Sequence, residues 1–127
     1  MSAVDWYEMS HLAYSNAAQN FAMILTMASA YLVVGYLVGS KLTRTQLISI
    51  NVVFIPAMMF FIYLFYGFTM DGASARAQAA EIVPEISVMP SSWEQPFGAL
   101  ALLVALGALF ISVKFMRDVR RQLNVDD

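Results

Sequence analysis

A stretch without any charged residue, Phe21 to Gly39, constrains this chain more than any other feature. As an α-helix rising about 1.5 Å per residue it is roughly 28 Å long, close to the ~30 Å hydrocarbon core of a bilayer. Two further apolar stretches of similar length follow it. The sequence therefore predicts an all-α integral membrane protein with three transmembrane helices, at about residues 17–40, 46–68 and 96–115.

The composition agrees with a chain that exposes much of its surface to lipid. Of its 127 residues, 60% are hydrophobic and only 13% are charged, whereas a soluble domain carries about 25% charged residues. The net charge of -2 and the lack of a basic run with interleaved aromatics give no basis for a nucleic-acid partner. The chain has no cysteine, which excludes disulfides and thiolate metal sites. We therefore expect one transmembrane domain, residues 1–127, whose first partner is the lipid bilayer.

Capping residues predict where the three helices begin. We expect the first helix to begin near Ser10, before it enters the membrane. Thr43 or Thr45 is suited to cap the second helix at its N-terminus. Ser91 and Glu94 have the spacing of a capping box at the start of the third helix. The turn between the first two spans is short, so these spans are expected to be antiparallel neighbours.

The one sizeable polar segment, residues 69–95, is expected to form an outer loop. The dipeptide Asp71-Gly72 predicts that the second helix ends there. Residues 73–83 are rich in alanine and predict a short extramembrane helix, which Pro84 ends.

Basic residues gather on one side of the predicted membrane, and this sets the expected orientation. Six of the seven lie in the first turn or after the third span: Lys41, Arg44, Lys114, Arg117, Arg120 and Arg121. Basic segments next to membrane spans stay in the cytoplasm. We therefore expect the N-terminus outside, the C-terminus inside, and residues 116–127 as a cytoplasmic tail. The expected location is the plasma membrane, as a multi-pass protein.

Small side chains recur along two spans, and they predict how the helices pack. Membrane helices associate through close contact of small residues and through interhelical hydrogen bonds, because lipid is as apolar as leucine. The small residues of span one recur every fourth position and then form a GxxxG motif: Ala18, Ala22, Thr26, Ala30, Gly35 and Gly39. Those of span three recur at spacings of three and four: Gly98, Ala101, Ala105, Ala108 and Ser112. Their partner is either another helix of the chain or another copy.

Asn51 is the polar side chain expected deepest in the second span, and its amide needs partners. A carbonyl exposed beside Gly35 is one candidate. The other is the carbonyl of Val52, because Pro56 lacks the N–H that would bond it and is expected to kink the helix. Asn51 is interpreted as a helix-packing residue, with a ligand or water contact as the alternative.

Apart from Lys114 at the cytoplasmic end of the third, no Asp, Glu, Lys, Arg or His lies inside a predicted span. Ion-coupled transporters, proton relays and voltage sensors normally need such residues. No phosphate-binding loop, nucleophile elbow or zinc-binding helix motif is present. We therefore predict no catalytic, cofactor or metal site, and no enzyme activity. A site at the outer interface that uses His11 and Glu8 is the weakest alternative.

The run from Tyr31 to Gln46, YLVVGYLVGSKLTRTQ, resembles a stretch of small uncharacterised three-span bacterial membrane proteins. This resemblance covers one helix and its loop. It implies a three-span fold and a bacterial inner-membrane location, and no chemistry.

These features together predict a non-enzymatic integral membrane protein whose helices associate through small-residue faces. It would form a homo-oligomer or serve as an accessory or structural subunit of a membrane complex. The alternative is a small oligomeric pore, channel or lipophile carrier built around Asn51, Ser49 and Thr26. Three spans enclose too little space for an aqueous path, so this alternative requires several copies.

Overall fold

The computed structural model describes residues 1–84 and 91–126, without the side chains of 91–97 and 123–126. The described chain is helical, and its elements in order are α1 (Ala3–Val38), η1 (Gly39–Lys41), α2 (Arg44–Ile82) and α3 (Ser91–Asp126).

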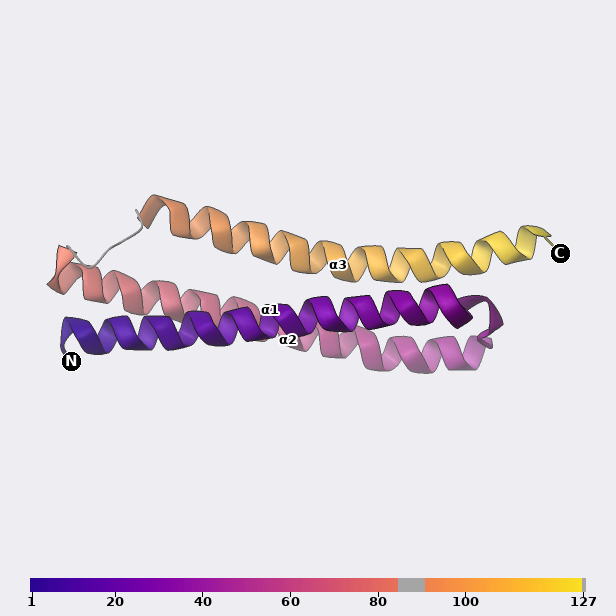
Figure 1. Cartoon of the computed structure of the whole chain (residues 1–127), viewed down its shortest axis with the longest axis horizontal. Helices are drawn as coiled ribbons and strands as arrows, with labels where there is room; N and C mark the ends of the chain where they lie inside the picture. Colours follow the sequence, from indigo (N-terminus) through magenta and orange to yellow (C-terminus); the bar gives the residue numbers. More distant parts are fainter. Residues whose placement is uncertain (85–90, 127) are drawn as a thin grey trace.

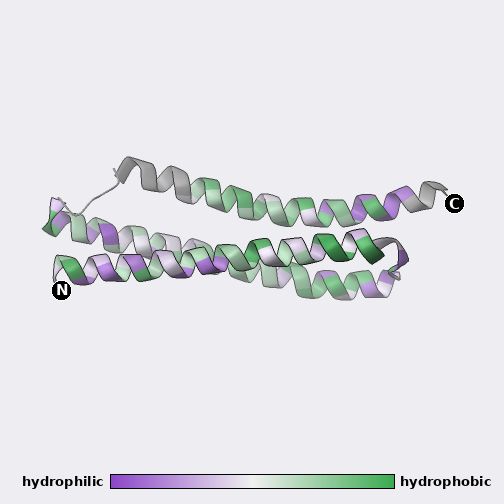
Figure 2. Ribbon diagram, in the orientation of Figure 1, coloured by the Kyte–Doolittle hydropathy of each residue, from purple (hydrophilic) through white to green (hydrophobic). Residues whose placement is uncertain are grey.

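The three long helices lie side by side, with α1 and α2 antiparallel along their length (Figure 1). The C-terminal end of α3 lies next to the η1 turn, and the N-terminus of the chain lies at the opposite end of the bundle (Figure 1). In the described residues, three helices are long and apolar enough to cross a membrane. Hydrophobic residues dominate the middle of the bundle, and hydrophilic residues concentrate near its ends (Figure 2). The fold is that of a multi-pass, all-α membrane protein.

α1 begins at Ala3, earlier than the predicted start near Ser10, because a capping box precedes it. The Ser2 N–H donates to Asp5 Oδ2 at 2.8 Å, and the Asp5 N–H donates to Ser2 Oγ at 3.2 Å. These two bonds satisfy backbone donors that an unpaired helix N-terminus leaves open. Hydrogen bonds from the Ser2 side chain and backbone also hold the pKa of the Asp5 carboxyl below its usual value.

α2 begins as predicted, with Thr43 as its N-cap. The Gln46 N–H donates to Thr43 Oγ1 at 3.2 Å, and Gln46 Oε1 accepts from the Thr43 N–H at 3.0 Å. The helix continues through Pro56 to Ile82. No observation tests the predicted kink at Pro56, which stays a prediction.

The predicted helix exit at Asp71-Gly72 is wrong, because α2 continues through both residues. The expected short helix at 73–83 is the C-terminal part of α2, and the expected outer loop at 69–95 is helical up to Ile82. Tertiary packing explains this result: a Cβ atom on residue 72 would lie 3.0 Å from the Tyr14 ring of α1. The glycine allows α1 and α2 to approach closely here, and this contact holds the helix together.

The length of α1 and α2 exceeds what a bilayer requires. With 36 and 39 residues, they measure about 54 and 58 Å at 1.5 Å per residue, against ~30 Å of hydrocarbon. Each of the two helices is therefore longer than one perpendicular crossing of the lipid core requires. The α3 helix begins at Ser91; the predicted capping bond between Ser91 and Glu94 lies outside the described side chains.

Buried residues of α1 and α2 follow a seven-residue repeat that the sequence analysis did not identify. On α1 the repeat consists of Ala3, Ser10, Ala17, Ile24 and Tyr31. On α2 it consists of Met58, Phe65, Gly72 and Ala79. Such a repeat is typical of helices that pack along one continuous seam, as in a coiled coil. Towards the chain's N-terminus the seam is lined by small residues, which let the two backbones lie close together.

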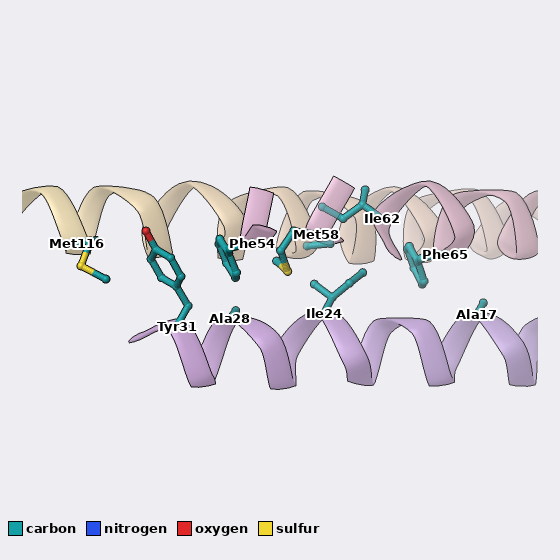
Figure 3. Close-up of a cluster of buried hydrophobic side chains, with 10 residues drawn as sticks. Ala17, Ile24, Ala28, Tyr31, Phe54, Met58, Ile62, Phe65 and Met116 are labelled. Atoms are coloured by element: carbon teal, nitrogen blue, oxygen red, sulfur yellow. The ribbon is translucent and has the colours of Figure 1, made fainter. Parts of the chain in front are cut away.

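Large side chains fill the seam towards the η1 turn (Figure 3). Tyr31 and Ile24 point from α1 towards Phe54 and Met58 of α2 (Figure 3). The rings of Tyr31 and Phe54 stack with their centroids 4.0 Å apart. Helix α3 completes this cluster with Ala105 and Met116, which are both buried.

Candidate helix-packing site and interfacial pocket

A polar pair joins α1 and α2 at the edge of the hydrophobic cluster. The hydroxyl of Tyr31 donates to Asn51 Oδ1 at 2.5 Å. Tyr31 is only 4% exposed, and Asn51 is half-buried. A hydrogen bond in such surroundings avoids the cost of leaving two polar groups unpaired among apolar side chains. The pair therefore links α1 to α2 at one position along their length.

The partner of Asn51 differs from both predicted partners. A backbone carbonyl, beside Gly35 or at Val52, was expected from the sequence, whereas the side-chain oxygen of Asn51 accepts from Tyr31. Tyr31 was missed because its ring counts as apolar in a span, although its hydroxyl requires a partner when buried. The useful signal would have been a tyrosine on the same helix face as the core residue Ile24, seven residues earlier.

Gly35 and Gly39, the two glycines of the GxxxG motif, face α3. A Cβ atom on Gly35 would lie 3.3 Å from both Met116 and Phe115, and one on Gly39 would lie 3.2 Å from Met116. Both glycines are buried. The missing side chains make room for Met116, so this motif is used for contact between α1 and α3 of the same chain.

The small residues of α3 also lie on its inner face. Ala105 and Ser112 are fully buried, and Ala101 and Ala108 are half-buried against the core. The Ser112 hydroxyl donates to the Ala108 carbonyl at 2.6 Å, within its own helix. Gly98 is half-buried, and a Cβ atom there would lie 3.3 Å from Thr69 of α2.

The four-residue repeat of small side chains on α1 lies on the side of that helix opposite its buried residues. Ala18, Ala22, Thr26 and Ala30 are all exposed. The Thr26 hydroxyl donates to the Ala22 carbonyl at 2.8 Å, so it needs no further partner. We call these four residues the outer stripe. They make no part of the buried core of this chain.

An arginine of α3 closes the bundle at the η1 end. The guanidinium of Arg120 donates through Nη1 to the Leu42 carbonyl, at 2.7 Å. Leu42 follows η1 and precedes the Thr43 cap, so this bond joins the third helix to the turn between the first two. From the sequence, Arg120 was expected only to contribute to the basic side of the membrane. Because Leu42 and Arg120 are far apart in the sequence, no local pattern predicts this bond.

Next to Arg120, a pocket of about 220 Å³ opens between the three helices. Its polar wall carries three arginines of α3, and its apolar wall is formed by residues of α2 and α3. The lining consists of Tyr31, Leu47, Asn51, Val113, Met116, Arg117, Arg120 and Arg121. The Tyr31–Asn51 pair thus borders a basic pocket. We call it the arginine pocket.

A second pocket, of about 280 Å³, lies towards the opposite end of the bundle. All three helices contribute to it, and its surface is mostly apolar. Its lining consists of Tyr14, Phe65, Tyr66, Thr69, Met70, Ala73, Gly98, Ala99 and Leu102. We call it the apolar pocket.

Groups for acid–base or metal chemistry are sparse in the described chain. Within residues 1–84 and 91–126, no three His, Asp or Glu side chains gather to hold a metal ion. The ring of His11 stacks on Tyr7 with an interplanar angle of 6°. Nothing in this geometry adds support to a site built on His11 and Glu8.

Comparison with known proteins identifies no relative: no family model, no curated protein and no solved structure matches the chain. The resemblance of residues 31–46 to small three-span bacterial membrane proteins stays a prediction.

Proposed function

We propose that this chain is a non-enzymatic integral membrane protein that functions by associating with other membrane helices. The observation that carries this proposal is the exposed outer stripe of α1. The small residues of α3 and the GxxxG motif are occupied inside the chain, whereas Ala18, Ala22, Thr26 and Ala30 are not.

Packing energetics explain why the outer stripe favours a protein partner. A lipid-facing surface gains nothing from small side chains, since large apolar ones contact acyl chains equally well. Small residues at every fourth position instead allow a second helix backbone to approach closely, which gains dispersion contacts and weak Cα–H···O bonds. Thr26 does not oppose this approach, because its hydroxyl is already bonded to the Ala22 carbonyl.

The simplest partner for the outer stripe is a second copy of the chain. A two-fold symmetric dimer pairs a patch with itself, and a straight stripe on one helix is complementary to its own copy. An accessory role, in which the stripe contacts a different subunit, uses the same surface. The plasma membrane, with a bacterial inner membrane as the narrower proposal, is the location in either case.

The proposed orientation has the N-terminus outside and the C-terminus in the cytoplasm. It rests on the basic residues near η1 and at the C-terminal end of α3, which the fold brings to one end of the bundle (Figure 1). In intact cells, a membrane-impermeant thiol reagent should label Glu81→Cys but not Thr43→Cys. Labelling of both positions without lysis would contradict this orientation.

Disulfide trapping in native membranes tests the association. Because the sequence has no native cysteine, only the introduced cysteine can form a disulfide from this chain. Ala22→Cys should form a crosslinked dimer when a mild oxidant is added. The matched control is Leu103→Cys, which lies at a similar distance from the predicted outer end of its span and is 67% exposed. A crosslink from Ala22→Cys to a heavier, different polypeptide would identify the accessory role. Equal trapping at both positions, or at neither, would refute the proposal.

The apolar pocket supports a second candidate function, the binding of a small lipophile. Its volume lies near the lower limit for ligand pockets, about 300 Å³. Ala73→Leu projects into this pocket and should weaken the binding of a fluorescent lipophile to the purified protein. Ala77→Leu, on the same helix but outside the lining, is the control. Identical binding by both variants would exclude the apolar pocket as the site.

A further inference from the structure

The arginine pocket combines three cations with an apolar wall. Arg117 lies three residues before Arg120 and four before Arg121, so it neighbours both on the helix surface, and all three line the pocket. Val113, one turn before Arg117 on the same face, and Leu47 of α2 form the apolar wall. The basic and the apolar parts of the pocket therefore follow one another along the axis of α3.

The positive charge of the pocket is not balanced by its own lining. No carboxylate lines the pocket among the described side chains. The nearest acidic residue along the helix, Asp118, is not part of this lining; it lines a neighbouring pocket together with Lys114, Arg117 and Arg121. Within the described part of the chain, Arg117 and Arg121 make no ion pair. Arg120 uses one N–H group for the Leu42 carbonyl, and a guanidinium has five.

Asn51 adds a hydrogen-bond donor to the lining of the pocket. Asn51 lines the pocket and accepts from Tyr31 through Oδ1. Its amide NH₂ therefore remains the donating end of this side chain. The pocket thus offers guanidinium and amide N–H groups beside apolar side chains, and this combination selects an anion attached to a hydrocarbon.

We propose that the arginine pocket binds the phosphate group of an anionic phospholipid. Arginine binds phosphate through paired N–H···O bonds of fixed geometry. Basic pockets between membrane helices are known to receive anionic lipid headgroups. Free inorganic phosphate shares this headgroup chemistry, but it makes no use of the wall formed by Val113 and Leu47. Those residues lie towards the lipid core, where an acyl chain continues from the headgroup.

This site is independent of the outer stripe, since the stripe is on the exposed face of α1 and the pocket lies between the helices. Lipid binding can therefore be measured whether or not the protein associates through Ala22.

The test uses the full-length chain, purified in a neutral detergent and titrated with phosphatidylglycerol. Bound lipid is counted by native mass spectrometry, and the Kd is measured from the shift in thermal unfolding. The double variant Arg117→Gln/Arg121→Gln should bind phosphatidylglycerol about 25-fold more weakly, from about five-fold for each basic residue at a membrane surface. Arg120 is left unchanged because its bond to Leu42 supports the fold.

The matched control is Lys41→Gln/Arg44→Gln, which removes the same charge at the same end of the bundle but outside the pocket. It should keep the Kd within about three-fold, because a localised pocket does not depend on charge elsewhere. Equal loss in both double variants would show a general basic surface and overturn the site. Phosphatidylcholine binding as tight as phosphatidylglycerol, or equal protection by inorganic phosphate at the same concentration, would overturn the anionic-lipid assignment.

Discussion

The hydrogen bond between Tyr31 and Asn51 gives the sharpest test of the packing described here. Tyr31→Phe removes the donor but keeps the ring on Phe54, whose centroid lies 4.0 Å away. Interhelical hydrogen bonds in membrane proteins contribute about 0.6 kcal/mol on average and up to about 1.7 kcal/mol. The 2.5 Å separation and the 4% exposure of Tyr31 place this bond near the upper value. We expect a coupling free energy of about 1.5 kcal/mol.

A double-mutant cycle measures this coupling without the other effects of each substitution. Tyr31→Phe and Asn51→Leu should each lower the free energy of unfolding by about 1.5 kcal/mol, and the double variant by about the same amount rather than twice as much. Reversible unfolding in mixed micelles, driven by a denaturing detergent and followed by circular dichroism, reports the free energy. Tyr63→Phe is the control, because Tyr63 is 72% exposed and should change stability by less than about 0.5 kcal/mol.

Additive losses in the double variant, within about 0.3 kcal/mol, would refute this reasoning. They would mean that the two side chains stabilise the protein independently, and that the bond does not join α1 to α2. A loss in Tyr63→Phe equal to that in Tyr31→Phe would likewise show that burial does not decide the effect.

Two further predictions concern the extended part of α1 and α2. Gly72→Ala should destabilise the protein by about 1–3 kcal/mol by overpacking against the Tyr14 ring, whereas Gly67→Ala, whose Cβ would meet nothing within 4 Å, should stabilise it by up to about 1 kcal/mol. Thermal unfolding of both variants separates the effect of the contact from that of helix propensity. Equal shifts in the two variants would contradict the close approach of α1 and α2 at Gly72. The pKa of the Asp5 carboxyl is lowered by its bonds to Ser2, so the cap stabilises α1 above about pH 4, and this stabilisation is lost as the pH falls through the lowered pKa. An NMR titration should show a higher pKa for Asp5 in the Ser2→Ala variant. An unchanged pKa would disprove the cap.

The start of α1 shows which local signals were available in the sequence. Ser2 and Asp5 have the spacing of a capping box, so the true beginning of the helix was present in the sequence. The expected start near Ser10 overlooked this spacing. The helix exit expected at Asp71-Gly72 was wrong for a different reason: a glycine in a polar segment usually marks an end, whereas Gly72 makes room for the Tyr14 ring.

The sequence alone determined the three apolar spans, a threonine cap at residue 43 or 45 and the basic end of the bundle. These are local properties: length and hydropathy fix whether a helix crosses lipid, and a cap involves residues three apart. Tertiary structure decided which faces are buried. On α1, the repeat at Ala18, Ala22 and Thr26 and the repeat at Ala17, Ile24 and Tyr31 are both regular. The second is buried, because it fits the large and small side chains of α2, and no pattern within one helix contains that information.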